Sequence, residues 1–126
     1  GAGTIPVLAS LAADPAGQRL NCNADTAAGE VAHAMKAEKF VVLSDTHGIR
    51  TDIDDPESNI PEITAEEIRK LIEDGTIAGG MLPKVEACLR ALEGGVKRTH
   101  IIDGRFPHSL LLEIFTHKGI GTQINA

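Results

Sequence analysis

The residue of this sequence that is best placed to take part in chemistry is a lysine that follows a glycine-rich turn. Lys84 ends segment 75–84 (GTIAGGMLPK), which leads directly into a predicted helix. The first N–H groups of a helix have no intrahelical partner and lie at the positive end of its dipole, so this arrangement favours a polyphosphate ligand. The spacing differs from GxxxxGK[ST] and excludes a P-loop. The alternative is a flexible glycine connection that carries one solvated lysine.

Further polar side chains follow three predicted strands, at the point where each strand ends. They form three groups: Asn21, Asn23 and Asp25; Ser44 and Asp45; and Asp103, Gly104 and Arg105. Ligands of open α/β sheets gather at the carboxyl ends of the strands. The sequence therefore predicts that these groups lie at one edge of a sheet and contribute to one binding site.

The elements that must position these residues alternate between strands and helices. Apolar or β-branched runs predict strands over 5–12, 19–22, 39–43, 98–102 and 120–124, and helical spacing predicts helices over 24–35, 64–74, 80–93 and 106–116. The run at 39–43 is typical of a parallel strand buried on both faces, and the alanine face of the first helix allows close approach to a sheet. Thr64 and Glu67 form a capping box, with Gly75 as the C-cap. Alternation of this kind indicates an α/β fold with right-handed crossovers, and the long polar loop 44–60 is a functional candidate.

Composition excludes several classes of function. The chain of 126 residues has a net charge of −6, no Trp or Tyr and three Phe, so it lacks both the basic field and the aromatic platforms of nucleic-acid-binding modules. No run approaches the roughly 18 apolar residues of a membrane span. Cys22 and Cys88 have no CxxC partner, and the start of the chain has no secretory signal. Reduced, buried thiols in a cytoplasmic protein are expected.

Four segments, in the same order along the chain, resemble the acetylglutamate kinases of the amino acid kinase superfamily. Segment 21–28 (NCNADTAA) is similar to N-x-N-A-D-x-A-A, and segment 43–49 (LSDTHGI) to a nucleotide-binding loop. Segment 79–87 (GGMLPKVEA) matches G-G-M-x-x-K-x-x-A. Segment 108–122 (HSLLLEIFTHKGIGT) resembles the C-terminal signature of the arginine-sensitive members. The four segments span nearly the whole chain.

The resemblance implies a three-layer α/β/α lobe of the amino acid kinase fold, with a mainly parallel sheet. It implies ATP-dependent phosphorylation, with Mg²⁺, of the side-chain carboxylate of N-acetyl-L-glutamate in arginine biosynthesis. By resemblance, Lys84 stabilises charge on the transferring phosphoryl group, Asp25 orients the catalytic lysines and Asn21 binds the substrate. The nucleotide site would comprise Asp45, Thr46, His47, Gly48, Ile49, Thr76, Ile77, Ala78 and Met81.

The same resemblance implies feedback inhibition by L-arginine, with His100, Glu113 and Gly119 as the pocket. For His100, a satisfied histidine of the sheet is the alternative. No protein ligand for a metal is expected, because the acidic run Asp52, Asp54, Asp55 and Glu57 lacks the spacing of a calcium loop and is expected to be a solvated face.

The family places a second catalytic lysine, a phosphate loop and most substrate contacts in an N-terminal lobe that this sequence does not contain. We therefore expect residues 1–126 to be the ATP-binding C-terminal lobe, inactive alone, from an enzyme that is a homo-oligomer. Two alternatives stay open: a non-catalytic module that binds nucleotide or arginine, and a kinase of a related acid or of a nucleoside monophosphate. For Asp25, the alternative is an aspartate that stabilises the start of a helix.

Overall fold

Four strands form the central sheet, in the order β3-β5-β6-β4. The computed structural model describes residues 3–52, 54–116 and 119–126. Strand β3 (Lys39–Ser44) runs parallel to β5 (Arg98–Asp103), and β4 (Glu62–Thr64) runs parallel to β6 (Thr122–Asn125), whereas β5 and β6 are antiparallel. The expected α/β fold with a mainly parallel sheet is confirmed.

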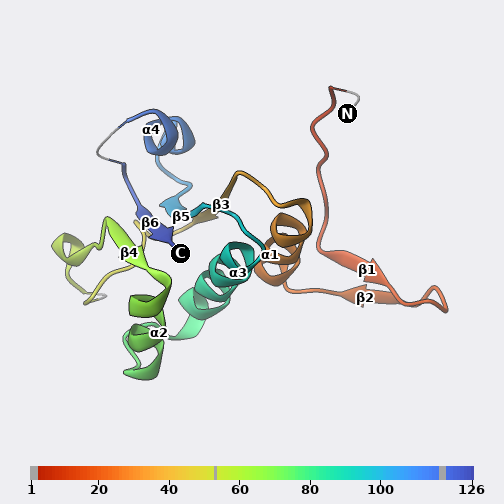
Figure 1. The fold of residues 1–126 in the computed structure, drawn as a ribbon, viewed down its shortest axis with the longest axis horizontal. Coiled ribbons are helices and arrows are strands. Elements are labelled where there is room, and N and C mark those ends of the chain that lie inside the picture. The colour runs from red at the N-terminus through yellow and green to blue at the C-terminus, as the bar shows by residue number, and fades with distance from the viewer. Residues whose placement is uncertain (1–2, 53, 117–118) are drawn as a thin grey trace.

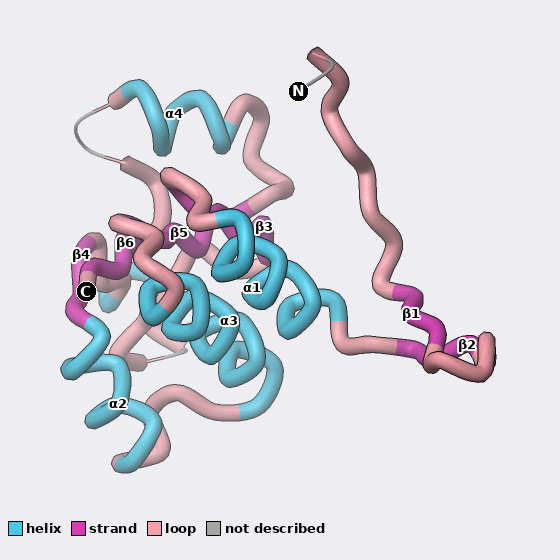
Figure 2. Tube along the Cα trace, turned by 45° about the vertical axis from the view of Figure 1, so that its right-hand side comes forward, coloured by secondary structure: helices cyan, strands magenta, loops and turns pink. Residues whose placement is uncertain are grey.

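Helices cover both faces of this sheet, as the three-layer prediction requires. Helix α4 (Ser109–Phe115) lies on one side, and α1 (Ala24–Met35), α2 (Ala65–Glu73) and α3 (Leu82–Glu93) lie on the other (Figure 1 and Figure 2). The core forms where α3 meets the two middle strands. Val85, Cys88, Ile101 and Ile124 are completely buried there. This burial raises the pKa of the Cys88 thiol to about 12.

Helices α1 and α3 pack closely because α1 carries a glycine at their contact. A Cβ atom on Gly29 would lie 2.9 Å from the Cα atom of Ala87, so no larger residue fits without moving one helix. The small-residue face of α1 was expected to allow close approach to a sheet. In the structure, its closest partner is instead the neighbouring helix α3.

Helix α2 begins and ends largely as its sequence predicts. The Thr64 hydroxyl accepts from the Glu67 N–H at 3.3 Å, and the Glu67 carboxylate accepts from the Thr64 N–H at 2.8 Å, which is the expected capping box. Asp74 is the C-cap, and Gly75 follows it with a φ of +83°. The three-residue strand β4 before this helix was not predicted, because it lies within a polar, proline-containing stretch.

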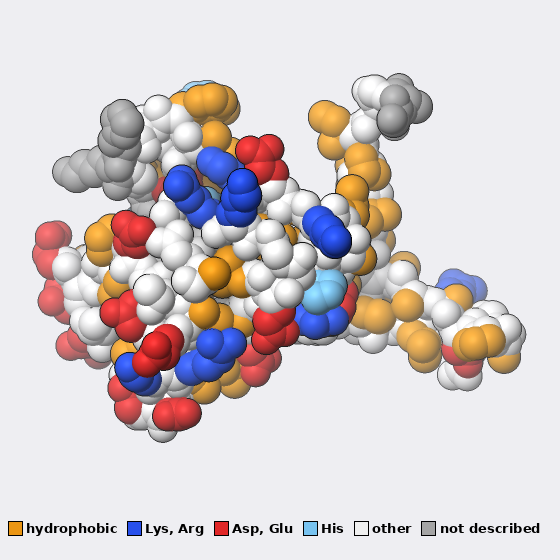
Figure 3. Space-filling view, in the orientation of Figure 1, with side chains coloured by type: hydrophobic (Ala, Val, Ile, Leu, Met, Phe, Trp, Pro, Cys, Tyr) orange, Lys and Arg blue, Asp and Glu red, His pale blue; other side chains and the backbone are white. Residues whose placement is uncertain are grey.

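The predicted strand at 5–12 is wrong. Only β1 (Leu11–Ala13) is a strand, and it pairs antiparallel with β2 (Arg19–Asn21) in a hairpin outside the central sheet. Ile5 and Val7 are more than 90% exposed, at 91% and 93%. Figure 3 shows apolar side chains along an arm that projects from the rest of the chain. An apolar run predicts burial only when another layer of side chains covers it.

The prediction for 39–43 is half correct. The strand is parallel to β5, but it is the outer strand of the sheet, and Leu43 is 58% exposed. The two C-terminal elements are shorter or shifted relative to the predictions, since α4 begins at Ser109 and β6 at Thr122. Among the residues that the structure describes, no helix is long and apolar enough to cross a lipid bilayer.

Candidate functional site

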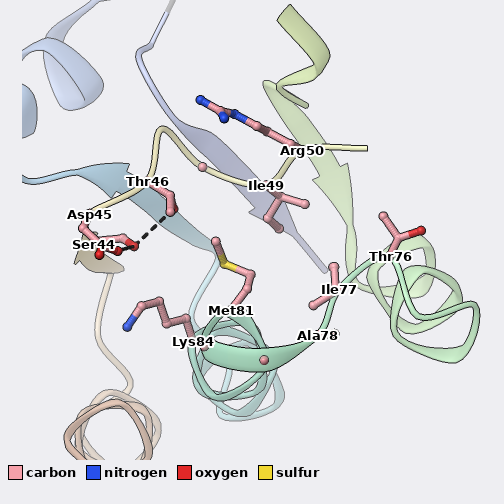
Figure 4. Close-up of a pocket in the computed structure, with 13 residues that line it drawn as sticks. Ser44, Asp45, Thr46, Ile49, Arg50, Thr76, Ile77, Ala78, Met81 and Lys84 are labelled. Carbon is pink, nitrogen blue, oxygen red and sulfur yellow. Dashed lines mark hydrogen bonds between the residues drawn. The ribbon is translucent and has the colours of Figure 1, made fainter. Parts of the chain in front are cut away.

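A pocket of about 620 Å³ opens between the loop after β3 and the segment that joins α2 to α3. Figure 4 shows the two segments facing each other across it. The lining residues are Ser44, Asp45, Thr46, Gly48, Ile49, Arg50, Thr76, Ile77, Ala78, Gly79, Gly80, Met81 and Lys84. Apolar side chains therefore line part of the pocket, and two cationic side chains belong to its lining.

The sheet fixes one wall of this pocket. Strands β3 and β5 end in register, with Ser44 opposite Asp103, and the Gly104 N–H donates to the Ser44 carbonyl oxygen at 2.8 Å. The Ser44 and Thr46 hydroxyl oxygens lie 3.2 Å apart, within hydrogen-bond distance. The two polar groups that follow β3 and β5, at 44–45 and 103–105, thus meet at one edge of the sheet, as predicted.

The other wall is a short turn that leads into α3. Gly79 has a φ of +56°, a conformation that favours glycine, and opens the 3₁₀ turn Gly79–Met81. Helix α3 follows directly, with Pro83 in its first turn, where a missing N–H costs no helical hydrogen bond. The Met81 N–H donates to the Ala78 carbonyl oxygen at 3.3 Å and the Leu82 N–H to that of Gly79, so the N–H groups that this wall can offer to a ligand lie at the start of the turn, at Gly79 and Gly80.

Lys84 and Asp25 form an ion pair between the starts of α3 and α1. The Lys84 Nζ atom lies 3.0 Å from the Asp25 Oδ2 atom, and both side chains are about three-quarters buried. Figure 4 shows Lys84 reaching from α3 toward the side of the pocket where Ser44 and Asp45 lie. Asp25 also lies in the first turn of α1, so the helix-start role and the lysine-orienting role are compatible.

A second charged cluster holds the two loops at the end of the sheet. The buried Asp103 carboxylate accepts from the Arg105 Nε atom at 3.0 Å and from its Nη2 atom at 2.8 Å. The His47 Nδ1 atom lies 3.4 Å from the same carboxylate. These hydrogen bonds from Arg105 lower the pKa of Asp103 from its ordinary 3.8 to about 2, despite burial.

All the residues predicted for the nucleotide site line the pocket, except His47. His47 faces Asp103 instead. Ser44, Arg50, Gly79 and Gly80 also line it but were not named for the nucleotide site. Ser44 was expected at the binding edge of the sheet, and Gly79 and Gly80 belong to the glycine-rich segment expected to favour a polyphosphate, so the sequence did carry a signal for these three residues. Arg50 follows its motif directly but has no spacing rule that would have singled it out.

Asn21 is not brought to this pocket. It ends β2 of the exposed hairpin, and it is not among the residues that line the pocket. Asn23 caps α1 by accepting from the Thr26 N–H at 3.1 Å. The predicted contact of Asn21 with a substrate stays a prediction.

His100, Glu113 and Gly119 lie together on the α4 side of the sheet. The His100 Nδ1 atom is 2.9 Å from the Glu113 Oε1 atom. The Glu113 Oε2 atom accepts from the N–H groups of Ile120 and Gly121, at 2.7 and 3.3 Å. Both carboxylate oxygens of Glu113 therefore already have partners within the chain, and its side chain is only 4% exposed. It presents no free bidentate face to a guanidinium in this structure.

Among the described residues, no group of three or more His, Cys, Asp or Glu side chains lies close enough to hold a metal ion. The lining of the pocket includes one carboxylate, Asp45, beside the hydroxyls of Ser44 and Thr46. This donor set fits a metal ion that takes most of its ligands from a bound phosphate, as Mg²⁺ usually does with nucleotides.

Comparison with known proteins gives one consistent family. The sequence profile of the amino acid kinase family matches residues 2–103. An acetylglutamate kinase of Symbiobacterium thermophilum is 57% identical over 123 residues, which is 98% of this chain and 42% of that protein. An acetylglutamate kinase of Synechococcus is also 57% identical, over 97% of this chain and 41% of its own length. The chain thus spans about two fifths of the length of these curated relatives.

Solved structures agree with the sequence comparison. An N-acetylglutamate synthase from Neisseria gonorrhoeae, complexed with coenzyme A and N-acetyl-glutamate, superposes with a TM-score of 0.83 at 34% identity. The match covers 93% of this chain and 26% of the synthase chain. The same synthase complexed with coenzyme A and L-arginine gives a TM-score of 0.79 over 92% of this chain and 26% of its own.

The Asp103–Arg105 pair makes a prediction about acid stability. Because the pKa of Asp103 is lowered to about 2, its ionised form stabilises the fold at pH values above 3.8, and this contribution is lost as the pH falls from 3.8 toward 2. Asp103→Asn should lower the urea midpoint at pH 7, and the difference from the unaltered chain should shrink over that window. Arg105→Gln should show the same pH dependence. A difference that stays constant from pH 7 to pH 2 would contradict this account.

Proposed function

Because the chain belongs to the amino acid kinase family, we propose that its pocket holds the phosphates of ATP. We propose further that the complete enzyme transfers the γ-phosphoryl group to the side-chain carboxylate of N-acetyl-L-glutamate, in arginine biosynthesis. The observation that carries the proposal is Lys84, which lies at the start of α3, lines the pocket and is held by Asp25 at 3.0 Å. The 57% identity to an acetylglutamate kinase supports the choice of substrate.

The proposed reaction needs positioning and positive charge more than covalent catalysis. A carboxylate is already ionised at neutral pH, so its oxygen can attack the γ-phosphorus atom without a general base. The bond from that phosphorus to the oxygen of ADP breaks as the new bond forms, and the products are an acyl phosphate and ADP. Charge on the transferring phosphoryl oxygens is stabilised by fixed cations and N–H donors.

Lys84 supplies such a cation, and Asp25 is its positioning residue. An ammonium group on a flexible side chain has many rotamers, and the 3.0 Å contact to Asp25 restricts them. The pair is about three-quarters buried, so its interaction is screened less than that of a surface pair. We propose that Lys84 contacts the phosphoryl oxygens while Asp25 holds it.

The nucleotide would lie with its phosphates toward Lys84 and its base among the apolar side chains. The N–H groups of Gly79 and Gly80, at the start of the turn into α3, suit phosphate oxygens. Ile49, Ile77 and Met81 line the pocket and offer apolar contact for a base. Mg²⁺ would neutralise phosphate charge and would be brought in by the nucleotide, and Asp45 is the carboxylate that lines the pocket beside it.

We propose that residues 1–126 are the nucleotide-binding lobe and that another lobe supplies the rest of the substrate site. In support, the chain spans about two fifths of its curated relatives. A groove of about 590 Å³ between the exposed arm and α1 is lined largely by apolar side chains, including Leu8, Leu11, Val31 and Met35. A surface of this kind is typical of a face that another part of the protein covers. Asn21, beside this groove, would then face the acyl amino acid.

We place the complete enzyme in the cytoplasm, where Cys22 and Cys88 would remain reduced, and we expect it to be a homo-oligomer.

The second candidate function is a binding module that holds nucleotide without transferring phosphate. The observation that favours it is that Asn21, the predicted substrate contact, is exposed and does not line the pocket with Lys84. Phosphorylation of N-acetyl-L-glutamate by the complete protein would distinguish the kinase from the module.

We also propose that L-arginine inhibits the complete enzyme. The gathering of His100, Glu113 and Gly119, and the arginine complex of the Neisseria synthase, support this proposal. Because Glu113 already accepts three hydrogen bonds within the chain, arginine binding at this carboxylate requires the 119–121 turn to move. The isolated chain should therefore bind arginine weakly.

ADP titration tests the nucleotide pocket in this chain. Amide shifts should appear first at residues 45–49 and 76–81, because those segments line the pocket. Lys84→Met should weaken ADP binding about tenfold, as expected for loss of a charged hydrogen bond to phosphate. It should lower the melting temperature only modestly, because the Asp25 carboxylate that loses its partner is still about one-fifth exposed. Glu86→Gln, on an exposed face of the same helix, is the control. Shifts confined to the loop 52–58, or none at millimolar ADP, would refute the pocket assignment.

Inhibition assays on the complete enzyme test the arginine proposal. Glu113→Gln should raise the concentration of L-arginine needed for half-inhibition about tenfold, because an amide cannot replace a carboxylate opposite a guanidinium. Glu38→Gln, an exposed glutamate before β3, should not change it. An enzyme that saturating L-arginine does not inhibit, or a Glu113→Gln enzyme with unaltered inhibition, would reject the proposal.

A further inference from the structure

The loop that lines the pocket is held from behind by one buried hydroxyl group. Thr122, the first residue of β6, is completely buried. Its Oγ1 atom accepts from the Ile49 N–H at 2.8 Å and donates to the Ile60 carbonyl oxygen at 2.6 Å. The hydroxyl therefore joins the two ends of the long loop after β3 to the central sheet, and its single proton is used.

Glycine permits this contact. Gly48 has a φ of +123°, and a Cβ atom there would lie 2.6 Å from the Thr122 Oγ1 atom. The backbone of the loop therefore approaches the hydroxyl only because residue 48 has no side chain. The Asn59 side-chain amide, oriented so that its nitrogen faces acceptors, donates to the carbonyl oxygens of His47 at 3.1 Å and Ile49 at 3.2 Å. Residues 47–49 are thus fixed on the side away from the pocket.

The position of Thr122 is itself fixed by its neighbours. Glu113 accepts from the N–H groups of Ile120 and Gly121, the two residues before it. In the sheet, Thr122 pairs with Ile101 of β5. A hydroxyl on so rigid a support can set the direction of a neighbouring N–H group, since the alternative is a buried N–H without an acceptor.

We propose that Thr122 is a positioning residue of the nucleotide pocket, which acts through the backbone N–H of Ile49. The inference builds on the proposed function, because it takes the pocket to be the nucleotide site. Thr122 is not a lining residue, so it would not touch the nucleotide. Gly48 and Ile49 do line the pocket, and their backbone would move if the hydroxyl were lost. Loss of the Thr122 hydroxyl should therefore weaken nucleotide binding.

The test compares Thr122→Val, which removes the hydroxyl at nearly constant volume, with Thr122→Ser, which keeps it. Thr99→Val is the matched control, because Thr99 is also a completely buried threonine, on the adjacent strand β5. Two quantities are measured in each folded chain: hydrogen exchange of the Ile49 amide, and the dissociation constant for ADP. Circular dichroism establishes that each variant is folded.

Thr122→Val should accelerate exchange of the Ile49 amide about tenfold and weaken ADP binding about three- to tenfold, the effect of losing one buried hydrogen bond. Thr122→Ser and Thr99→Val should stay within about twofold of the unaltered chain on both measures, because both keep the bond from Ile49. A Thr122→Val chain with unaltered Ile49 exchange, or with unaltered ADP affinity, would overturn the proposal.

The two measurements also distinguish a wrong nucleotide assignment from a wrong role for Thr122. If the unaltered chain does not bind ADP, the nucleotide assignment fails, while Ile49 exchange still reports whether Thr122 holds the loop. If Thr122→Val does not fold, Thr122→Ser decides. A protected Ile49 amide with retained ADP affinity in that variant supports the role of the hydroxyl, and an unprotected amide with retained affinity overturns it.

Discussion

The close contact between α1 and α3 is the constraint on which the site depends. Gly29 of α1 touches Ala87 of α3 at the distance that only a glycine allows. Asp25 lies one turn before Gly29, and Lys84 lies one turn before Ala87, so each ionic residue shares a face with its contact residue. Bringing the two helices together at that point therefore places the Lys84 Nζ atom against the Asp25 carboxylate at 3.0 Å. The close packing of the two small residues therefore also sets the geometry of the charged pair.

Charge is arranged differently on the two sides of the pocket. The Lys84 side faces the starts of two helices, where dipoles and N–H groups favour an anion. At the end of the sheet, Asp103 is paired with Arg105 and lies close to His47. Its negative charge is thus largely balanced by neighbours within the chain, so it offers little repulsion to an anionic ligand at the adjacent loop. An acidic chain, with a net charge of −6, can in this way contain a local site for phosphate.

Sequence reasoning was most successful where a local signal has one structural meaning. The capping box at Thr64 and the alternation of strands and helices have such meanings, and the residues predicted for the site make up most of the lining of the pocket. It failed where burial depends on a partner, as for the apolar segment at 5–12, which is exposed. It also could not show that His47 faces away from the pocket that its neighbours line. The direction of the His47 side chain depends on Asp103, which lies 56 positions away in the sequence. The role of Thr122 depends in the same way on tertiary contact with Ile49, 73 positions away.

A crystal structure of this chain with Mg²⁺ and a non-hydrolysable ATP analogue would show whether Lys84 contacts the phosphates. We expect phosphate oxygens within hydrogen-bond distance, about 2.7–3.2 Å, of the Lys84 Nζ atom and of the N–H groups of Gly79 or Gly80. We expect the base against Ile49, Ile77 or Met81. Phosphates bound elsewhere on the chain, or a Lys84 that keeps only its contact with Asp25 while the nucleotide lies out of its reach, would contradict the account.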